Sequence, residues 1–445
     1  MAATLDTPCH KGNGVFLEIK RITKYHQFVE RPSLLSAASG YENYRGFLNL
    51  LYVILGIGGC RLVIENILKY GLLIEFDWPI KFLKDPTNWP SAFLIVLVNF
   101  FILFELWLEI RLSNLHSKIK IAWISLQFVN LIALLVFPAV YIYHREPNPV
   151  GAFIAVSLYT IVFLKLFSYL HINYQCRQAL FVKKNSTIQS DVSKSELLCP
   201  NNLTLKNLYY FMFAPTLCYD LDFPRSSGIR KGFILRRCAE ILVLLSLQYC
   251  LSQQWMLPIL RTLDRPLNQY STLENIERLL RLALPNHLLW LILFYVYFHS
   301  ILNLLAELLC FGDRLFYRDW WNATDLSEFW NRWNTSVHDF CKRHIYKPLV
   351  IQCGFNSFTG SLVVFIISAF FHEYLISVPL RMIRPWSFLA MMIQVPMGLI
   401  VKRISVENKT YGNLAVWISL ILIQPIAILL YIQDLFYRDY VKDKP

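Results

Sequence analysis

Two polar side chains stand one helical turn apart in an otherwise apolar stretch, SLVVFIISAFFHEYLISVPL. Ser368 and His372 would lie on the same side of a helix, because residues four apart are neighbours on its surface. Glu373 follows His372 directly. Histidine exchanges protons readily near neutral pH, but a lone buried histidine is more often a satisfied core residue. The chemistry of this stretch therefore leaves a catalytic base and a structural histidine both open.

A second polar stripe recurs every four residues: His299, Asn303 and Glu307. Here we favour a structural interpretation, a seam of hydrogen bonds between helices. Glu105, Lys165 and Glu240 also fall within apolar runs. Ionisable residues at membrane depth cost at least about 2.5 kcal/mol each, so we expect these three to have buried partners.

Between these two stretches lies a loop rich in tryptophan, FGDRLFYRDWWNATDLSEFWNRWNTSVHDFCKRHIYKPLV. Its periodicity is amphipathic, and its tryptophans alternate with basic residues. Such a segment is expected at a membrane interface, with its rings at headgroup level. It would be either a plain surface helix or a lid over a site that receives an amphipathic, anionic substrate.

The composition indicates which elements must position these residues. Of 445 residues, 56% are hydrophobic and only 16% are charged. A soluble domain carries roughly 25% charged residues, so this chain is expected to be membrane-embedded. Basic residues between the apolar runs account for the net charge of +13 without any nucleic-acid partner. The ten cysteines show no CxxC pair, so we expect neither a metal site nor a disulfide framework.

Apolar runs of about 20 residues are long enough to cross a bilayer. We predict an all-α polytopic protein with a cytosolic arm over 1–45, an embedded domain over 46–437 and a lumenal tail over 438–445. The excess of Lys and Arg places the long loops 173–232 and 310–350 in the cytosol. About nine spans are expected, at 47–70, 92–112, 119–142, 151–172, 233–259, 281–309, 357–380, 386–402 and 411–436.

Two motifs in this chain resemble those of a known family. FYRDWWN, from Phe316 to Asn322, resembles the FYxDWWN signature of the sterol and diacylglycerol acyltransferases, a branch of the membrane-bound O-acyltransferase superfamily. FHEY, from Phe371 to Tyr374, resembles the superfamily's catalytic-histidine motif. Further stretches resemble diacylglycerol O-acyltransferases of the type-1 class; they are NYRGFLN, NLTLKNLYYFMFAPTLCYDLDFPR, QQWMLP, PNHLLWL, SVPLRM and YGNLAVWISLILIQPIA.

The resemblance implies the fold of that superfamily and transfer of an acyl group from acyl-CoA to the hydroxyl of 1,2-diacylglycerol. His372 would be the general base and Glu373 would orient its ring. No cofactor is implied, since acyl-CoA is a co-substrate. It also implies a multi-pass protein of the endoplasmic reticulum membrane, in contact with lipid and forming a homodimer or homotetramer.

The thioester carbonyl needs a hydrogen-bond donor as negative charge develops on its oxygen. Asn322 and Gln394 are our candidates, and Gln424 is a weaker third for which a structural role is at least as probable. No Ser or Cys stands in a nucleophile motif, so we expect direct attack on the thioester. Basic residues around FYRDWWN and in 225–237 would contact the CoA phosphates. The predicted substrate contacts are Phe316, Tyr317, Asp319, Trp320, Trp321, Ser368, Met391, Gln394 and Gln424.

Two alternatives stay open. The same chemistry would serve acylation of a sterol, retinol or a fatty alcohol, because FYxDWWN is shared with sterol acyltransferases. A membrane transporter would also have many spans and buried charges, but it would show repeat symmetry and interrupted helices in two matching halves.

Overall fold

A computed structural model describes residues 77–113, 120–185, 201–262 and 270–442, with 33, 45–47, 49–51, 71 and 73–75. Most of the predicted first span, 47–70, and most of the predicted arm therefore lie outside the described residues. The described part is helical, with one isolated β-bridge between Arg225 and Phe311. Its α-helices are α4 (Trp78–Lys84), α5 (Trp89–Ser113), α6 (Lys120–Arg145), α7 (Pro149–Asn185), α8 (Leu205–Phe213), α9 (Lys231–Leu251), α10 (Leu257–Arg261), α11 (Thr272–Phe294), α12 (Leu302–Leu308), α13 (Leu326–Trp333), α14 (Thr335–Cys341), α15 (Ser357–Leu380), α16 (Trp386–Met392), α17 (Gln394–Glu407) and α18 (Lys409–Lys442).

Seven helical segments in the described residues are long and apolar enough to cross a membrane. They confirm seven of the nine predicted spans; they are Pro86–Ser113, Ile121–Arg145, Pro149–Ala179, Thr272–Leu308, Ser357–Leu380, Trp386–Glu407 and Lys409–Leu435. The predicted span at 233–259 is helical as α9, a π-helical turn over Ser252–Met256 and α10. It is less apolar than the seven, because Arg236, Arg237 and Glu240 interrupt it. The count of nine therefore stays a prediction.

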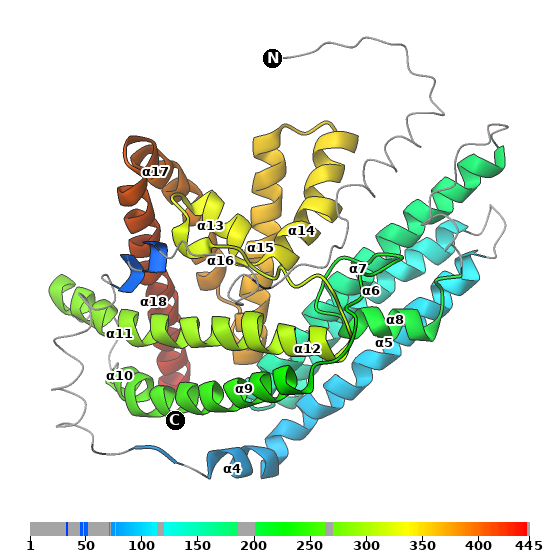
Figure 1. Cartoon of the computed structure of the whole chain (residues 1–445). Helices are drawn as coiled ribbons and strands as arrows, with labels where there is room; N and C mark the ends of the chain where they lie inside the picture. The colour runs from blue at the N-terminus through cyan, green and yellow to red at the C-terminus, as the bar shows by residue number, and fades with distance from the viewer. Residues whose placement is uncertain are drawn as a thin grey trace.

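The helices form two groups around α15 (Figure 1). In one group α5, α6 and α7 run side by side, and α15 packs against α7. In the other group α16, α17 and α18 pack together, with α11 crossing beside α18 and α9 beneath α11. The lower end of α18 lies at the same edge as α4 and α10, whereas α13 and α14 lie near the opposite edge. The predicted lumenal tail and the helices α13 and α14 of the 310–350 loop therefore lie at opposite edges.

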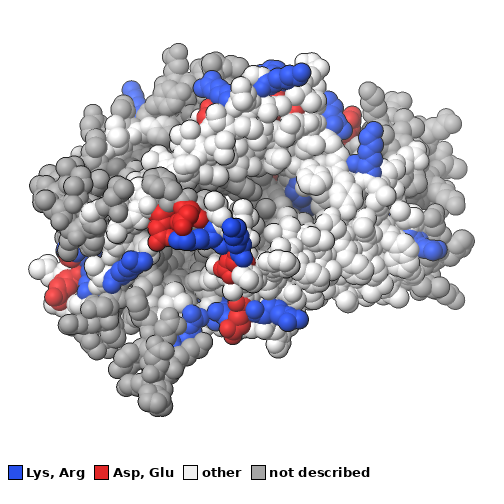
Figure 2. Space-filling view, turned by 90° about the horizontal axis from the view of Figure 1, so that it is seen from below, with Lys and Arg blue, Asp and Glu red and all other residues white. Residues whose placement is uncertain are grey.

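The lower face carries small groups of mixed charge on a mostly uncharged surface (Figure 2). Charged residues of opposite sign also pair in the described part of the chain. Lys81 bonds to Glu75 (3.1 Å), and Arg384 bonds to Asp434 (3.2 Å).

The ionisable residues within the apolar helices have buried partners, as expected. Lys165 donates from Nζ to the carbonyls of Phe211 (2.8 Å), Met212 (3.0 Å) and Ala214 (2.6 Å) at the C-terminal end of α8. A cation there satisfies carbonyls that the helix leaves unpaired and complements the helix dipole. Glu105 accepts from Asn130 Nδ2 at 2.7 Å.

The second polar stripe is also structural. His299 Nδ1 bonds to the hydroxyl of Tyr317 (2.8 Å), and Asn303 Nδ2 donates to the His299 carbonyl (2.7 Å). Glu307 accepts from Arg230 (2.9 Å) and Arg314 (2.7 Å). The stripe thus fastens the 225–237 loop and the FYRDWWN loop to the α11–α12 segment.

Candidate active site

Helix α15 carries His372 through the centre of the molecule. Asn356 begins the helix by accepting a hydrogen bond from Thr359 N (2.7 Å), and the helix ends where Arg381 turns left-handed with φ of 53°. Two sides of α15 are packed. Tyr374 donates to the Leu135 carbonyl of α6 (2.7 Å), and Phe371 contacts Phe163 of α7 with ring centroids 5.7 Å apart.

The ring of His372 is held in one tautomer. Its Nδ1 bonds to the backbone carbonyl of Ser368 (2.8 Å). A carbonyl only accepts, so Nδ1 carries the hydrogen and Nε2 of the neutral ring is the free base. Among the described residues, none takes a hydrogen bond from or to Nε2. The predicted general base is therefore oriented, and the atom that would accept a proton is open.

His372 is exposed although it lies in the middle of a membrane-spanning helix. Phe365 is seven residues earlier and lies within about 20° of it around the helix axis. The ring of Phe365 contacts Trp330 of α13, with centroids 6.4 Å apart. The open side of His372, which we call the His372 face, therefore looks toward α13 and away from α6 and α7.

Gln394 is the first residue of α17 and directly follows α16, which packs against α15. The Oε1 atom of Gln394 accepts a hydrogen bond from Trp330 Nε1 (2.8 Å). Trp330 thereby connects the predicted carbonyl donor to the His372 face.

Gln424 and Met391, the two other predicted substrate contacts in the last helices, both pack within the protein. Gln424 is fifteen residues into α18 and accepts from Asn286 Nδ2 of α11 (3.2 Å). Met391 is buried in α16. The structural interpretation of Gln424 is the better one, because its acceptor joins two helices.

Glu373 does not orient His372, contrary to the expectation from adjacency. Its carboxylate accepts hydrogen bonds from the hydroxyls of Ser377 and Tyr431 and from Phe388 N (2.9 Å). Consecutive residues of a helix point about 100° apart, so Glu373 faces α16 and α18 while His372 faces α13. Glu373 fastens three helices together beside the site.

The rings of the FYRDWWN motif are packed into the protein core. Phe316, Tyr317, Trp320 and Trp321 are each at most 3% exposed. Trp320 packs against Phe329 of α13, with ring centroids 6.0 Å apart. Asp319 bonds to Arg332 at 3.0 Å. These contacts give the motif a structural role, and its predicted contacts with substrate stay a prediction.

Asn322 closes the motif by fastening a distant segment. Its Oδ1 accepts from Gly46 N (2.7 Å), and its Nδ2 donates to Asp319 (3.4 Å). Neither partner belongs to α15. A Cβ at Gly46 would lie 1.5 Å from the Trp321 carbonyl oxygen, so only glycine permits this approach. The hydrogen bonds assign Asn322 to this junction and leave Gln394 as the better donor candidate.

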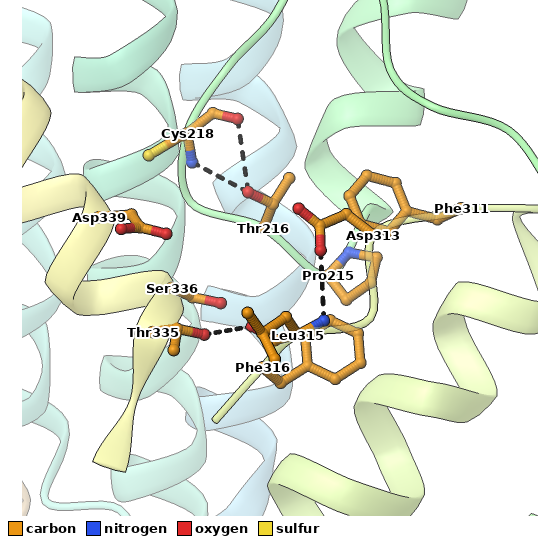
Figure 3. A pocket seen from close by; sticks show the side chains of 10 residues that line it. All are labelled: Pro215, Thr216, Cys218, Phe311, Asp313, Leu315, Phe316, Thr335, Ser336 and Asp339. Atoms are coloured by element: carbon orange, nitrogen blue, oxygen red, sulfur yellow. Dashed lines mark hydrogen bonds between the residues drawn. The ribbon is translucent and has the colours of Figure 1, made fainter. Parts of the chain in front are cut away.

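A small polar pocket lies between the 215–218 loop, the 311–316 loop and α14 (Figure 3). The Asp313 carboxylate accepts from Leu315 N (3.3 Å), and Thr216 Oγ1 accepts from Cys218 N (3.3 Å). Ser336 and Asp339 line the pocket from α14. Two carboxylates in the lining make this pocket unsuitable for the phosphates of a polyanion.

Most arginines of the 225–237 loop are committed to ion pairs. Arg230 pairs with Glu307, and Arg236 with Glu240 (3.1 Å). Arg318 and Lys342 are instead exposed. Burial lowers the pKa of His338, opposed by Asp339 and reinforced by Lys342 and Arg318. Both cations therefore act electrostatically on His338 of α14.

Trp330 and Tyr431 were not predicted as site residues. Trp330 was noted only as one of four tryptophans, and Tyr431 lies 58 residues from its partner Glu373. The sequence holds one signal for Trp330: Asp325 is a typical N-cap residue at the start of the helix that carries it. In the structure Asp325 caps α13 by accepting from Glu328 N (2.8 Å), and the capped helix holds Trp330 in a fixed direction.

Known proteins are similar to this chain along most of its length. The membrane-bound O-acyltransferase family matches residues 102–433. A protein of Bos taurus named Diacylglycerol O-acyltransferase 1 is 46% identical, over 91% of this chain and 84% of its own length. Diacylglycerol O-acyltransferase 1-2 of Oryza sativa subsp. japonica is 37% identical over 93% and 86% of the two chains. Diacylglycerol O-acyltransferase 1 of Dictyostelium discoideum is 36% identical over 96% and 67%.

Proposed function

This chain belongs to the membrane-bound O-acyltransferase family, and we propose that it transfers an acyl group from acyl-CoA to 1,2-diacylglycerol, giving triacylglycerol and CoA. The observation that carries the mechanism is the hydrogen bond between His372 Nδ1 and the Ser368 carbonyl (2.8 Å). It leaves Nε2 as an open base on the His372 face, in the middle of a membrane-spanning helix.

The first step is removal of a proton from the acceptor. His372 Nε2 accepts the proton of the diacylglycerol hydroxyl, while the oxygen of this hydroxyl attacks the carbonyl carbon of the thioester. A positioned base contributes roughly 10²–10⁴-fold to such a step. The neutral ring can take this proton because its Nδ1 hydrogen is already bonded to the Ser368 carbonyl and the lone pair of Nε2 is open.

The second step is collapse of the tetrahedral intermediate. The Nε2–H groups of Gln394 would stabilise the oxyanion, since the Trp330 indole already occupies Oε1. The carbon–sulfur bond breaks, and the CoA thiolate takes the proton held on His372 Nε2. The ester and the free thiol leave, and the imidazole returns to its neutral state without an acyl-enzyme.

The head of acyl-CoA carries phosphates and stays in water. We assign its contact to Arg318 and Lys342, the exposed cations near His338, in place of the arginines that form ion pairs. The acidic pocket of Figure 3 would repel the phosphates and thus helps to direct them to these cations. On this assignment, α13, α14 and the 310–350 loop are cytosolic.

The same proposal covers location and assembly. We propose an endoplasmic reticulum membrane protein, with the end of α18 in the lumen and a homodimer or homotetramer as the working form. The arrangement in Figure 1 supports the sidedness, because the lower end of α18 lies opposite α13 and α14.

The alternative acceptors are sterol, retinol and fatty alcohols. Diacylglycerol is favoured because relatives that are 46% and 37% identical carry its name. A transporter is disfavoured, because the family is one of O-acyltransferases and matches residues 102–433.

The test uses microsomes that express the chain, supplied with labelled acyl-CoA and with diacylglycerol, cholesterol or a fatty alcohol in parallel. We expect labelled triacylglycerol, lost in His372→Ala and retained in His144→Ala, a matched change at an exposed histidine in the last turn of α6. Cholesteryl or wax ester without triacylglycerol would overturn the acceptor. Turnover at the wild-type rate by a folded His372→Ala variant would overturn the mechanism.

A further inference from the structure

Gln394 can donate a hydrogen bond to the oxyanion only if the nitrogen of its side-chain amide points toward the substrate. An amide can present either oxygen or nitrogen, and only the nitrogen can donate to an oxyanion. The hydrogen-bond partner identifies which end of the amide it meets. The indole Nε1 of Trp330 is a donor only, so the Gln394 atom 2.8 Å from it is the oxygen.

Trp330 itself is fixed by its surroundings. It lies on α13, which begins at the Asp325 cap and contacts α17. Its ring packs against Phe329 (5.1 Å) and, across the site, against Phe365 of α15 (6.4 Å). A rigid donor on a capped helix holds a partner more precisely than solvent does.

From these contacts we propose that Trp330 is a positioning residue for the reaction: it holds Gln394 by its oxygen and thereby turns the amide nitrogen toward the His372 face. This inference rests on the proposed function. Trp330 belongs to the loop that carries the acyl-CoA contacts, so the carbonyl donor is set from the cytosolic side, while His372 is set by its own helix through Ser368.

The experiment is a double-mutant cycle with Trp330→Phe and Gln394→Ala. Phenylalanine keeps the ring and removes only the N–H donor. Removing an oxyanion donor typically lowers kcat 10²–10³-fold, so we expect about 10²-fold for Gln394→Ala and about tenfold for Trp330→Phe. The KM for acyl-CoA should change little in both. In the Gln394→Ala background, Trp330→Phe should have no further effect on kcat, because its effect acts through Gln394.

Trp386, at the start of α16, offers a matched control. Trp386 Nε1 donates to Asp434 (2.6 Å) at the lower end of α16, away from the His372 face. Trp386→Phe removes the same kind of hydrogen bond and should leave kcat within about twofold of wild type. Thermal unfolding of each purified variant separates loss of fold from loss of positioning.

Two results would overturn the inference while leaving the proposed function intact. One is a kcat for Trp330→Phe no lower than that for Trp386→Phe. The other is a multiplicative loss in the double variant, which would mean that the two residues act independently. Failure of the proposed function looks different: wild-type activity in His372→Ala, or no triacylglycerol from the wild-type chain.

Discussion

Replacing Glu373 by glutamine separates the catalytic and structural roles of the FHEY motif. The carboxylate accepts from Ser377, from Tyr431 and from Phe388 N (2.9 Å), so it joins α15, α16 and α18. Glutamine keeps one accepting oxygen and places an NH₂ group where the other oxygen meets a donor. A hydrogen bond to a charged group contributes about 1.5–3 kcal/mol, and losing one of the set should lower the free energy of unfolding by about that amount.

The measurement is thermal unfolding of the purified protein in detergent, paired with specific activity well below the melting temperature. We expect Glu373→Gln to lower the Tm by several degrees. The folded fraction should keep its pH profile, since the His372 ring is oriented by Ser368. Tyr431→Phe should cost less in the Glu373→Gln background than in wild type, because both changes remove one contact. An unchanged Tm with abolished activity and a shifted pH profile would show that Glu373 acts on His372, and the structural reasoning would be wrong.

Three further predictions concern the cytosolic loops and the topology. The double variant Arg318→Gln/Lys342→Gln should raise the KM for acyl-CoA about tenfold with kcat nearly unchanged, and it should weaken the salt dependence of KM. The control variant Arg236→Gln, at an exposed arginine, should do neither. Burial, reinforced by Lys342 and Arg343, lowers the pKa of Lys347 to about 8 from its usual 10.5. Burying the protonated amine of Lys347 therefore lowers the free energy of unfolding below pH 8, and this loss disappears as the pH rises toward 10.5. Lys347→Met should raise the Tm at pH 7 but not above pH 10.5. In sealed microsomes, a protease should reach a tag within 173–232 from outside, whereas a tag after Pro445 should be digested only after detergent is added; digestion of both would require an even number of spans.

The sequence was sufficient for the elements that periodicity and length determine. Seven predicted spans are confirmed, because a run of about 20 apolar residues has few other structures open to it. The position of His372 in the middle of α15 follows from the same reasoning. The span predicted over 233–259 stays a prediction, since Arg236, Arg237 and Glu240 make it less apolar, and their pairing is visible only in the structure.

The parts that sequence reasoning missed depend on contacts between distant residues. An aromatic, amphipathic segment suits a membrane interface and a protein core equally well, because both offer an apolar side and hydrogen-bond partners. Trp320 and Trp321 belong to the core, which only the tertiary structure reveals. Glu373 was assigned to His372 by adjacency, although neighbours on a helix point in different directions. The ion pair of Arg332 with Asp319 likewise joins α13 to the FYRDWWN motif, which no local pattern reveals.

The junction at the end of FYRDWWN has a consequence for how the protein is made. Asn413 donates to the carbonyls of Trp321 (3.0 Å) and Ala323 (2.7 Å), and accepts from Asn49 (2.9 Å). Three segments therefore meet there: one near the beginning of the chain, one in the middle and one in its last helix. At roughly 5–20 residues per second, Asn413 leaves the ribosome tens of seconds after Asn49. Until then the early segment lacks its partner, so a chain truncated before α18 should be recognised as unfinished and degraded during biogenesis.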